Sequence, residues 1–187
     1  IPPDVPIVLY LGILQDYQGI PHLIRAAKIV TEQRPDVHFL IMGFPNQARY
    51  ADLAAELGVG DRVRLPGQVP YEDTPQHLAL GTIAAAPKLS ATEGAAKLLY
   101  YMSTGLPIVA FDTPVSREYL GDLGLRAEPG SVSGLAEIIL ALLDDPAAAR
   151  QRGAALRQRV IDRYTWTQGG ERITRVYQTV CPHPRGV

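Results

Sequence analysis

The chain is poor in cysteine, in net charge and in long apolar runs, and each shortage excludes a class of protein. Among 187 residues there is one cysteine, Cys181, which cannot form an internal disulfide and so predicts a reducing, cytoplasmic compartment. The formal net charge is −1, so no nucleic-acid partner is expected. No apolar run reaches the roughly 18 residues of a transmembrane helix. Residues 1–12 do not resemble a signal peptide, and residues 1–5 are interpreted as the remnant of a linker.

Several chemical motifs are missing as well. The histidines show no HxH or HExxH spacing, so no metal site is predicted; they are His22, His38, His77 and His183. The strand position of His38 indicates a structural histidine with satisfied ring nitrogens. No GxGxxG fingerprint is present, which argues against a dinucleotide cofactor, and no GxSxG elbow is present, which excludes that type of serine hydrolase.

Strand and helix signals alternate along almost the whole chain. Apolar runs predict strands at 6–11, 37–42, 62–65, 82–86, 108–111 and, as an edge strand, 123–127. Helical spacing predicts helices at 19–33, 47–57, 71–80, 95–103, 115–120, 132–143, 147–164 and 167–180. This alternation predicts a single α/β domain over residues 1–187, built on a three-layer, Rossmann-like, doubly wound parallel sheet. Residues 147–180 are expected to form its closing helices.

In such a sheet the ligand lies beyond the carboxyl ends of the strands, which directs attention to the loops there. Gly12 and Gly19 bracket the first loop, where glycine lets the backbone approach a ligand closely, although an ordinary turn is equally compatible. Gly43 and Phe44 open the second loop; the aromatic ring is able to frame a base, but a plain loop is favoured.

The loop after the third strand offers a weaker signal. Pro66 and Gly67 leave backbone groups free of strand pairing, and Gln68 and Val69 follow them. These positions are candidates for reading the edge of a nucleotide base.

The segment Ser90–Lys97, SATEGAAK, carries the strongest functional signal. Thr92 or Glu93 is suited to bind sugar hydroxyls, because a carboxylate accepts two hydrogen bonds at once. Gly94 and Ala95 offer N–H groups at a helix start, and Lys97 follows in the first turn, which together predict a phosphate site. The alternatives are a helix-capping role for Glu93 and a solvated charge for Lys97.

The C-terminal helices are rich in arginine. A solvated helix face is the favoured interpretation, and peripheral contact with anionic lipid headgroups is the alternative. Tyr164 and Trp166 are expected to anchor this tail by packing.

Five segments, taken in order, resemble one family. They are YLGILQDYQGIPHLIRAAKIV, DVHFLIMGFPNQ, LGVGDRVRLPGQVPYEDTPQHLALG, EGAAKLLYYMSTGLPIVAFDTP and LLDDPAAARQRGAALRQRVIDRYTWTQGGERITRVY. From about Val8 to Tyr177 the chain resembles the C-terminal, nucleotide-sugar-binding half of a GT-B fold glycosyltransferase of group 1 (family 4). The resemblance implies a retaining transferase that moves a sugar from a nucleotide diphosphate sugar to an acceptor. It also implies no metal or cofactor, an N-terminal acceptor domain missing here, and a fragment that is inactive alone.

Three positions depart from the family's pattern. Members carry basic residues where this chain has Ile13 and Gln18, and a ribose-facing glutamate where it has Tyr100. A subset of the family has a lysine that aligns with Lys97, which would replace part of the lost positive charge. The resemblance thus yields the following substrate-binding residues: Gly12, Gln18, Gly19, Gly43, Phe44, Gln68, Val69, Thr92, Glu93, Gly94, Ala95, Lys97 and Tyr100. A degenerate, non-catalytic GT-B module and a nucleotide-sugar epimerase are the alternatives.

Overall fold

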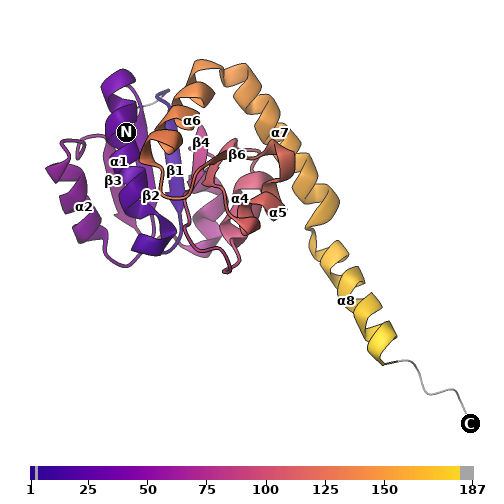
Figure 1. Ribbon diagram of the computed structural model, residues 1–187. Coiled ribbons are helices and arrows are strands. Elements are labelled where there is room, and N and C mark those ends of the chain that lie inside the picture. The colour runs from indigo at the N-terminus through magenta and orange to yellow at the C-terminus, as the bar shows by residue number, and fades with distance from the viewer. Residues whose placement is uncertain (3, 182–187) are drawn as a thin grey trace, which may run out of the picture.

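A six-stranded parallel sheet forms the centre of the protein (Figure 1). The computed structural model describes residues 1–2 and 4–181, so Pro3 of the expected linker and His183 lie outside the described residues. The strands are β1 (Ile7–Leu11), β2 (His38–Met42), β3 (Val63–Gly67), β4 (Ile83–Ala86), β5 (Ile108–Phe111) and β6 (Leu125–Ala127). Their order is β3-β2-β1-β4-β5-β6, which confirms the doubly wound α/β fold and the edge position of the last strand.

Helices cover both faces of this sheet. The α-helices are α1 (Ile20–Gln33), α2 (Gln47–Glu56), α3 (Thr74–Leu78), α4 (Ala96–Ser103), α5 (Pro114–Leu120), α6 (Val132–Asp144), α7 (Pro146–Arg163) and α8 (Trp166–Val180). Single 3-10 turns lie at Asp16–Gln18, Tyr71–Asp73 and Gly121–Leu123. The helix expected over 71–80 is therefore a 3-10 turn followed by a short α-helix, with Pro75 in the first turn, where its missing N–H is tolerated.

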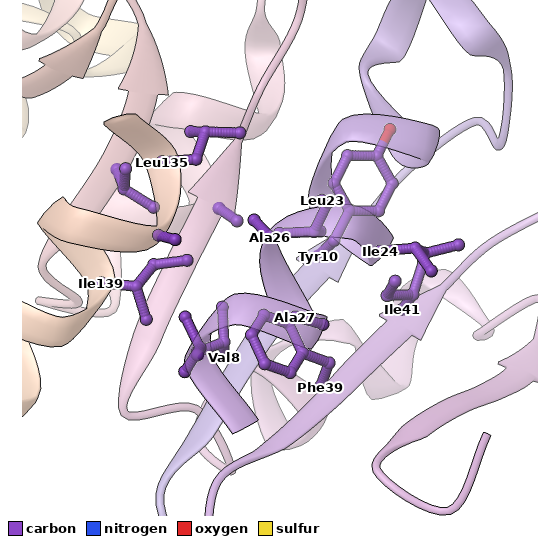
Figure 2. Close-up of a cluster of buried hydrophobic side chains, with 14 of the residues drawn as sticks. Val8, Tyr10, Leu23, Ile24, Ala26, Ala27, Phe39, Ile41, Leu135 and Ile139 are labelled. Carbon is purple, nitrogen blue, oxygen red and sulfur yellow. The ribbon is translucent and has the colours of Figure 1, made fainter. Parts of the chain in front are cut away.

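Side-chain alternation along the strands divides the core into two layers. In β1, Val8 and Tyr10 face the layer formed with α1, α2 and α6, and Figure 2 shows both among the buried side chains of that layer. Ile7 and Leu9 face the layer formed with α3, α4, α5 and α7. β1, β4 and β5 are covered on both sides and have continuously apolar sequences, whereas the edge strands β3 and β6 each contain an arginine.

The point where the strand order reverses lies between β1 and β4. These strands pair only at Val8–Ile83 and Leu9–Ala84, so they diverge toward their carboxyl ends. Beyond the last pair, the Tyr101 hydroxyl of α4 accepts a hydrogen bond from the Leu11 N–H and donates one to the Leu11 carbonyl, at 2.8 and 3.1 Å. The resulting crevice is the position at which open α/β sheets bind ligands.

The C-terminal tail differs from the expectation in two respects. Tyr164 packs against Tyr119 as expected, with ring centroids 5.3 Å apart, but Trp166 is 97% exposed and does not pack against the described residues. Figure 1 shows α8 extending away from the sheet, and none of its residues is buried. The predicted solvated face is wrong for part of α7, because Arg152, Arg157 and Arg159 donate hydrogen bonds to main-chain carbonyls of the body.

The ring of His38 is hydrogen-bonded at one of its two nitrogens. Nε2 of His38 lies 3.2 Å from the Arg62 guanidinium, whereas its Nδ1 is buried without a partner among the described residues, so this histidine is only half satisfied. Burial, followed by the charge of Arg62, lowers the pKa of His38.

Within the part of the chain that the structure describes, no helix combines the length and apolarity needed to cross a bilayer.

Candidate functional site

A pocket of about 300 Å³ opens beyond the carboxyl end of β1. It is framed by the loop after β1, the start of the α3 region, and the loop that leads into α4. Its lining residues are Leu11, Gly12, Ile13, Gln18, Tyr71, Thr74, Lys88, Glu93, Gly94, Ala95, Ala96, Lys97, Tyr100 and Tyr101.

The pocket brings together about half of the residues that the sequence singled out. Those that line it are Gly12, Gln18, Glu93, Gly94, Ala95, Lys97 and Tyr100. Those outside its lining are Gly19, Gly43, Phe44, Gln68, Val69 and Thr92. Phe44 and Thr92 are exposed, while Val69 packs against the α3–α4 side of the core. Within the described residues, the loop after β2 therefore contributes nothing to the wall of this pocket, and the connection after β3 contributes Tyr71 but not Gln68 or Val69.

Lys97 is the central cation of the site. Its Nζ donates hydrogen bonds of 2.6 Å to the Tyr10 hydroxyl and 2.6 Å to Oε1 of Gln18, and it lies 4.3 Å from the centroid of the Tyr10 ring. Burial, reinforced by the nearby charge of Lys88, lowers the pKa of Lys97 to about 7. The alternative of a solvated surface charge is therefore wrong.

Gln18 is the partner that makes this arrangement possible. It is 4% exposed, and its side-chain oxygen accepts from Lys97. A lysine at this position would place a second ammonium against the first. The departure at Gln18 and the presence of Lys97 thus belong to one arrangement, in which the positive charge comes from α4 instead of from the loop after β1.

Close backbone approach explains the glycines that bracket these loops. A Cβ at Gly12, where φ is +154°, would lie 3.0 Å from Nζ of Lys97. A Cβ at Gly43 would overlap the carbonyl oxygen of Gly12, and one at Gly19 would overlap that of Pro87. Gly43 and Gly19 therefore allow neighbouring loops to pack on one another, while Gly12 leaves room for the Lys97 ammonium.

Lys88 is the residue that the sequence reading missed. It lies two residues after the end of β4 and is 6% exposed. Its Nζ donates to the carbonyls of Glu93 and Gly94 at 2.9 and 2.8 Å, and it forms an ion pair with the Glu93 carboxylate at 2.7 Å. The alternative of a helix-capping role for Glu93 is wrong, because the N-cap of α4 is Ala95 and no side chain caps it. The available signal was a lysine embedded in the apolar run AAAPKL.

The first turn of α4 is consequently open to a ligand. The first N–H groups of a helix have no partner within it, and they carry the positive end of the helix dipole. With Lys97 in the same turn, an anion in the pocket would meet N–H donors and an ammonium together.

Two tyrosines stand at the mouth of the pocket. Tyr71 is 73% exposed and Tyr100 is 42% exposed. Hydrogen bonding with Tyr71, together with burial, raises the pKa of Tyr100. Of the described lining residues, Glu93 is the sole carboxylate, and Lys88 already holds it.

A larger hollow of about 830 Å³ lies beside α1 and α2. Two of its charged groups are paired: Arg49 lies 2.8 Å from the Asp16 carboxylate, which also accepts from the Tyr50 hydroxyl at 2.8 Å. Among the described residues, no group of three or more His, Cys, Asp or Glu side chains is arranged to hold a metal ion.

Comparison with known proteins places this geometry in context. The family model described as glycosyl transferases group 1 matches residues 1–159. A GDP-mannose-dependent monoacylated alpha-(1-6)-phosphatidylinositol monomannoside mannosyltransferase of Corynebacterium glutamicum is 30% identical, over 93% of this chain and 47% of the relative. An alpha-D-kanosaminyltransferase of Streptomyces kanamyceticus is 26% identical, over 95% of this chain and 46% of the relative. The chain therefore spans about half the length of the curated relatives it matches.

Solved structures show the same fold. Sucrose-phosphate synthase from Thermosynechococcus elongatus matches with a TM-score of 0.85 and 26% identity, over 96% of this chain and 46% of its own. HepE from Anabaena, crystallised in complex with UDP and glucose, matches with a TM-score of 0.84 and 21% identity, over 92% and 48%. The C-terminal domain of LpcC, a group 1 glycosyl transferase of Francisella tularensis, matches with a TM-score of 0.76 and 19% identity, over 89% of both chains.

Proposed function

The chain belongs to the group 1 family of glycosyl transferases, and we propose that it is the donor-binding domain of a retaining glycosyltransferase. In this proposal the whole enzyme transfers a sugar from a nucleotide diphosphate sugar to an acceptor. The observation that carries the proposal is Lys97, a largely buried amine in the first turn of α4 that lines a pocket at the sheet crevice. Among the described residues, no carboxylate lies within ion-pair distance of it.

The pocket has the groups that a departing nucleoside diphosphate requires. Negative charge develops on the diphosphate as the bond to the sugar breaks, and fixed donors aimed at that charge lower the barrier. Lys97 and the open N–H groups of α4 are such donors. An anion beside Lys97 favours its charged form, so donor binding would protonate the amine and hold it ready for the leaving group.

In this proposal the acceptor site lies outside the present chain. Relatives are about twice as long as this chain, and we place the acceptor site on a further, N-terminal domain. The exposed apolar side chains Ile173, Val176, Tyr177 and Val180 of α8 offer that domain a surface to pack against. The chain alone is then expected to bind donor without turning it over, and no cofactor is part of the mechanism.

Titration calorimetry tests the proposal directly. The 187-residue chain is titrated with UDP, GDP and ADP, and with UDP-glucose, GDP-mannose and ADP-glucose. We expect one base to bind in the micromolar to millimolar range, and Lys97→Met to weaken that binding by about tenfold or more, as expected for a lost hydrogen bond to a charged group. The matched control is Lys28→Met, which removes an exposed lysine on α1. If the wild-type chain bound none of these ligands at millimolar concentration, the donor site would be refuted.

A non-catalytic binding module is the second candidate, and Tyr100 is the observation that favours it. In this chain the phenol of Tyr100 stands at the mouth of the pocket, where a carboxylate would accept two hydrogen bonds from a ribose. Tyr100→Glu separates the two functions. If the wild type binds no nucleotide and Tyr100→Glu does, the domain has decayed; if the wild type already binds as well as the variant, the module hypothesis fails.

A further inference from the structure

Lys88 has no part in the proposed chemistry, yet it is the most deeply buried lysine of the site. It is 6% exposed, whereas the ion-pair partner Glu93 has a side chain that is 51% exposed. A buried ammonium without partners is strongly unfavourable, so such a group persists in a fold only where it is fully hydrogen-bonded.

The partners of Lys88 match its donors one for one. An ammonium has three N–H donors, and the three acceptors are the carbonyl oxygens of Glu93 and Gly94 and the carboxylate of Glu93. All three acceptors belong to two consecutive residues. A single side chain therefore fixes the backbone of that dipeptide and the direction of its acidic side chain. We refer to Lys88, Glu93 and Gly94 as the clasp.

The clasp fixes the end of the loop that leads into α4, and other hydrogen bonds fix its start. The N–H of Leu89 donates to the Tyr17 carbonyl at 2.9 Å, which joins the start of the loop to the turn before α1. The N–H of Glu93 donates to the Ser90 hydroxyl at 3.3 Å. The clasp then holds the last two residues before the N-cap of α4, and so it determines where the open N–H groups of that helix lie relative to the pocket.

The clasp also sets the charge of the pocket. Lys88 and Lys97 both line it, and the charge of Lys88 disfavours protonation of Lys97 while that of Glu93 favours it. Pairing Lys88 with Glu93 cancels one positive charge and leaves Lys97 as the cation available to a ligand.

We propose that Lys88 is a positioning residue of the donor pocket, which holds Glu93 and Gly94 so that the N-terminal turn of α4 faces a bound diphosphate. This inference rests on the proposed donor site for its ligand, but the loop geometry that it invokes exists without ligand. It assigns Lys88 no contact with the reacting atoms.

Three variants of the 187-residue chain test the proposal. Lys88→Met removes the clasp, Glu93→Gln removes only its ion pair, and Lys28→Met removes an exposed lysine as the control. Amide hydrogen exchange of residues 89–95 reports the loop without any ligand. We expect faster exchange there in Lys88→Met, a smaller increase in Glu93→Gln, and wild-type exchange in Lys28→Met.

Binding is measured with inorganic pyrophosphate, which needs no base, and with UDP-glucose across a range of pH. Lys88→Met is expected to weaken pyrophosphate binding about tenfold to a hundredfold, the scale of a misplaced binding group. The pH midpoint of UDP-glucose binding should move upward in Lys88→Met and downward in Glu93→Gln, because the two charges act on Lys97 in opposite directions. A role in folding alone would not produce these opposite shifts.

The outcomes separate this inference from the donor site itself. Unchanged exchange over 89–95 in both clasp variants overturns the positioning role, whatever the ligand does. Should Lys88→Met fail to fold, Glu93→Gln, with its half-exposed side chain, gives the decisive exchange measurement. If the wild type binds neither probe while the variants loosen the loop, the clasp stands as a structural device and the donor site fails.

Discussion

The titration of Lys97 predicts that donor binding weakens as the pH rises above neutrality. Burial and the neighbouring Lys88 place the pKa of this amine at about 7 in the free protein, against an ordinary value of 10.5. A bound diphosphate brings two negative charges to the same place and favours the charged amine. Binding above pH 7 should therefore take up one proton.

The size of the effect follows from linkage. Once the pH exceeds the pKa of free Lys97, each further unit lowers the affinity by about tenfold, as long as the amine of the complex stays protonated. Between pH 7 and pH 9 the dissociation constant should rise by up to about a hundredfold, or roughly 2.7 kcal/mol. Below pH 7 the affinity should level off, because the free amine is already charged.

UDP-glucose is a suitable ligand for this assay, since both of its phosphates are esterified and keep a constant charge near neutral pH. Calorimetry in two buffers with different enthalpies of ionisation counts the protons taken up. Lys97→Met removes the titrating group, so its weaker binding should not change over the same pH range. The reasoning would be refuted by a wild-type affinity that is constant from pH 6 to 9, or by the same pH profile in Lys97→Met.

The remaining predictions concern stability. Gly43→Ala should lower the free energy of unfolding in urea by at least about 2 kcal/mol, because its Cβ would overlap a loop carbonyl. Gly58→Ala, with open space around it, should lower it by about 1 kcal/mol for its positive φ alone. Equal losses in the two variants would contradict this reasoning. Tyr164→Ala should lower the free energy of unfolding by about 1–2 kcal/mol, because it removes a ring contact and a hydrogen bond to a main-chain carbonyl. Trp166→Ala should change it by no more than about 0.5 kcal/mol. A larger Trp166 effect would show that this ring packs in solution. The free energy of unfolding of the wild type should rise between pH 7 and 10, because the unfolded chain binds the Lys97 proton more strongly than the folded chain does. Lys97→Met removes this titrating group and should make the rise smaller.

Much of the fold could be predicted because buried parallel strands leave an unmistakable pattern. The runs that became β1 and β5 are apolar at every position, β2 is apolar after His38, and Gly12 and Gly43 mark the ends of β1 and β2. Asp145 stands directly before Pro146, an order typical of a helix start, and its carboxylate accepts from the Ala148 N–H at 3.0 Å. Local signals of this kind depend on neighbours in the sequence, which a reader of one sequence can see.

The site was predicted only in part because its key contacts join distant segments. Lys97 was singled out for its place in a helix start, but its two partners lie 79 and 87 residues away. Lys88 is harder to identify, because two of its three acceptors are main-chain carbonyls, which every residue has, and the sequence does not show that the loop folds back to bring the Glu93 carboxylate to its ammonium. Trp166 shows the opposite error, since its aromatic side chain suggests a packing residue, but no element of the described part of the chain covers it.

The Tyr101 hydroxyl has a consequence for water. At the point where β1 and β4 separate, the N–H and carbonyl of Leu11 would otherwise turn toward the crevice, and a water molecule is the usual partner of such groups. One phenolic oxygen serves both and leaves the ring buried beneath the pocket. In the proposed site, Leu11 would then need no water beneath a bound diphosphate, and charges act on one another more strongly where water is excluded. A phenylalanine in this place would keep the shape of the ring and let the solvent in.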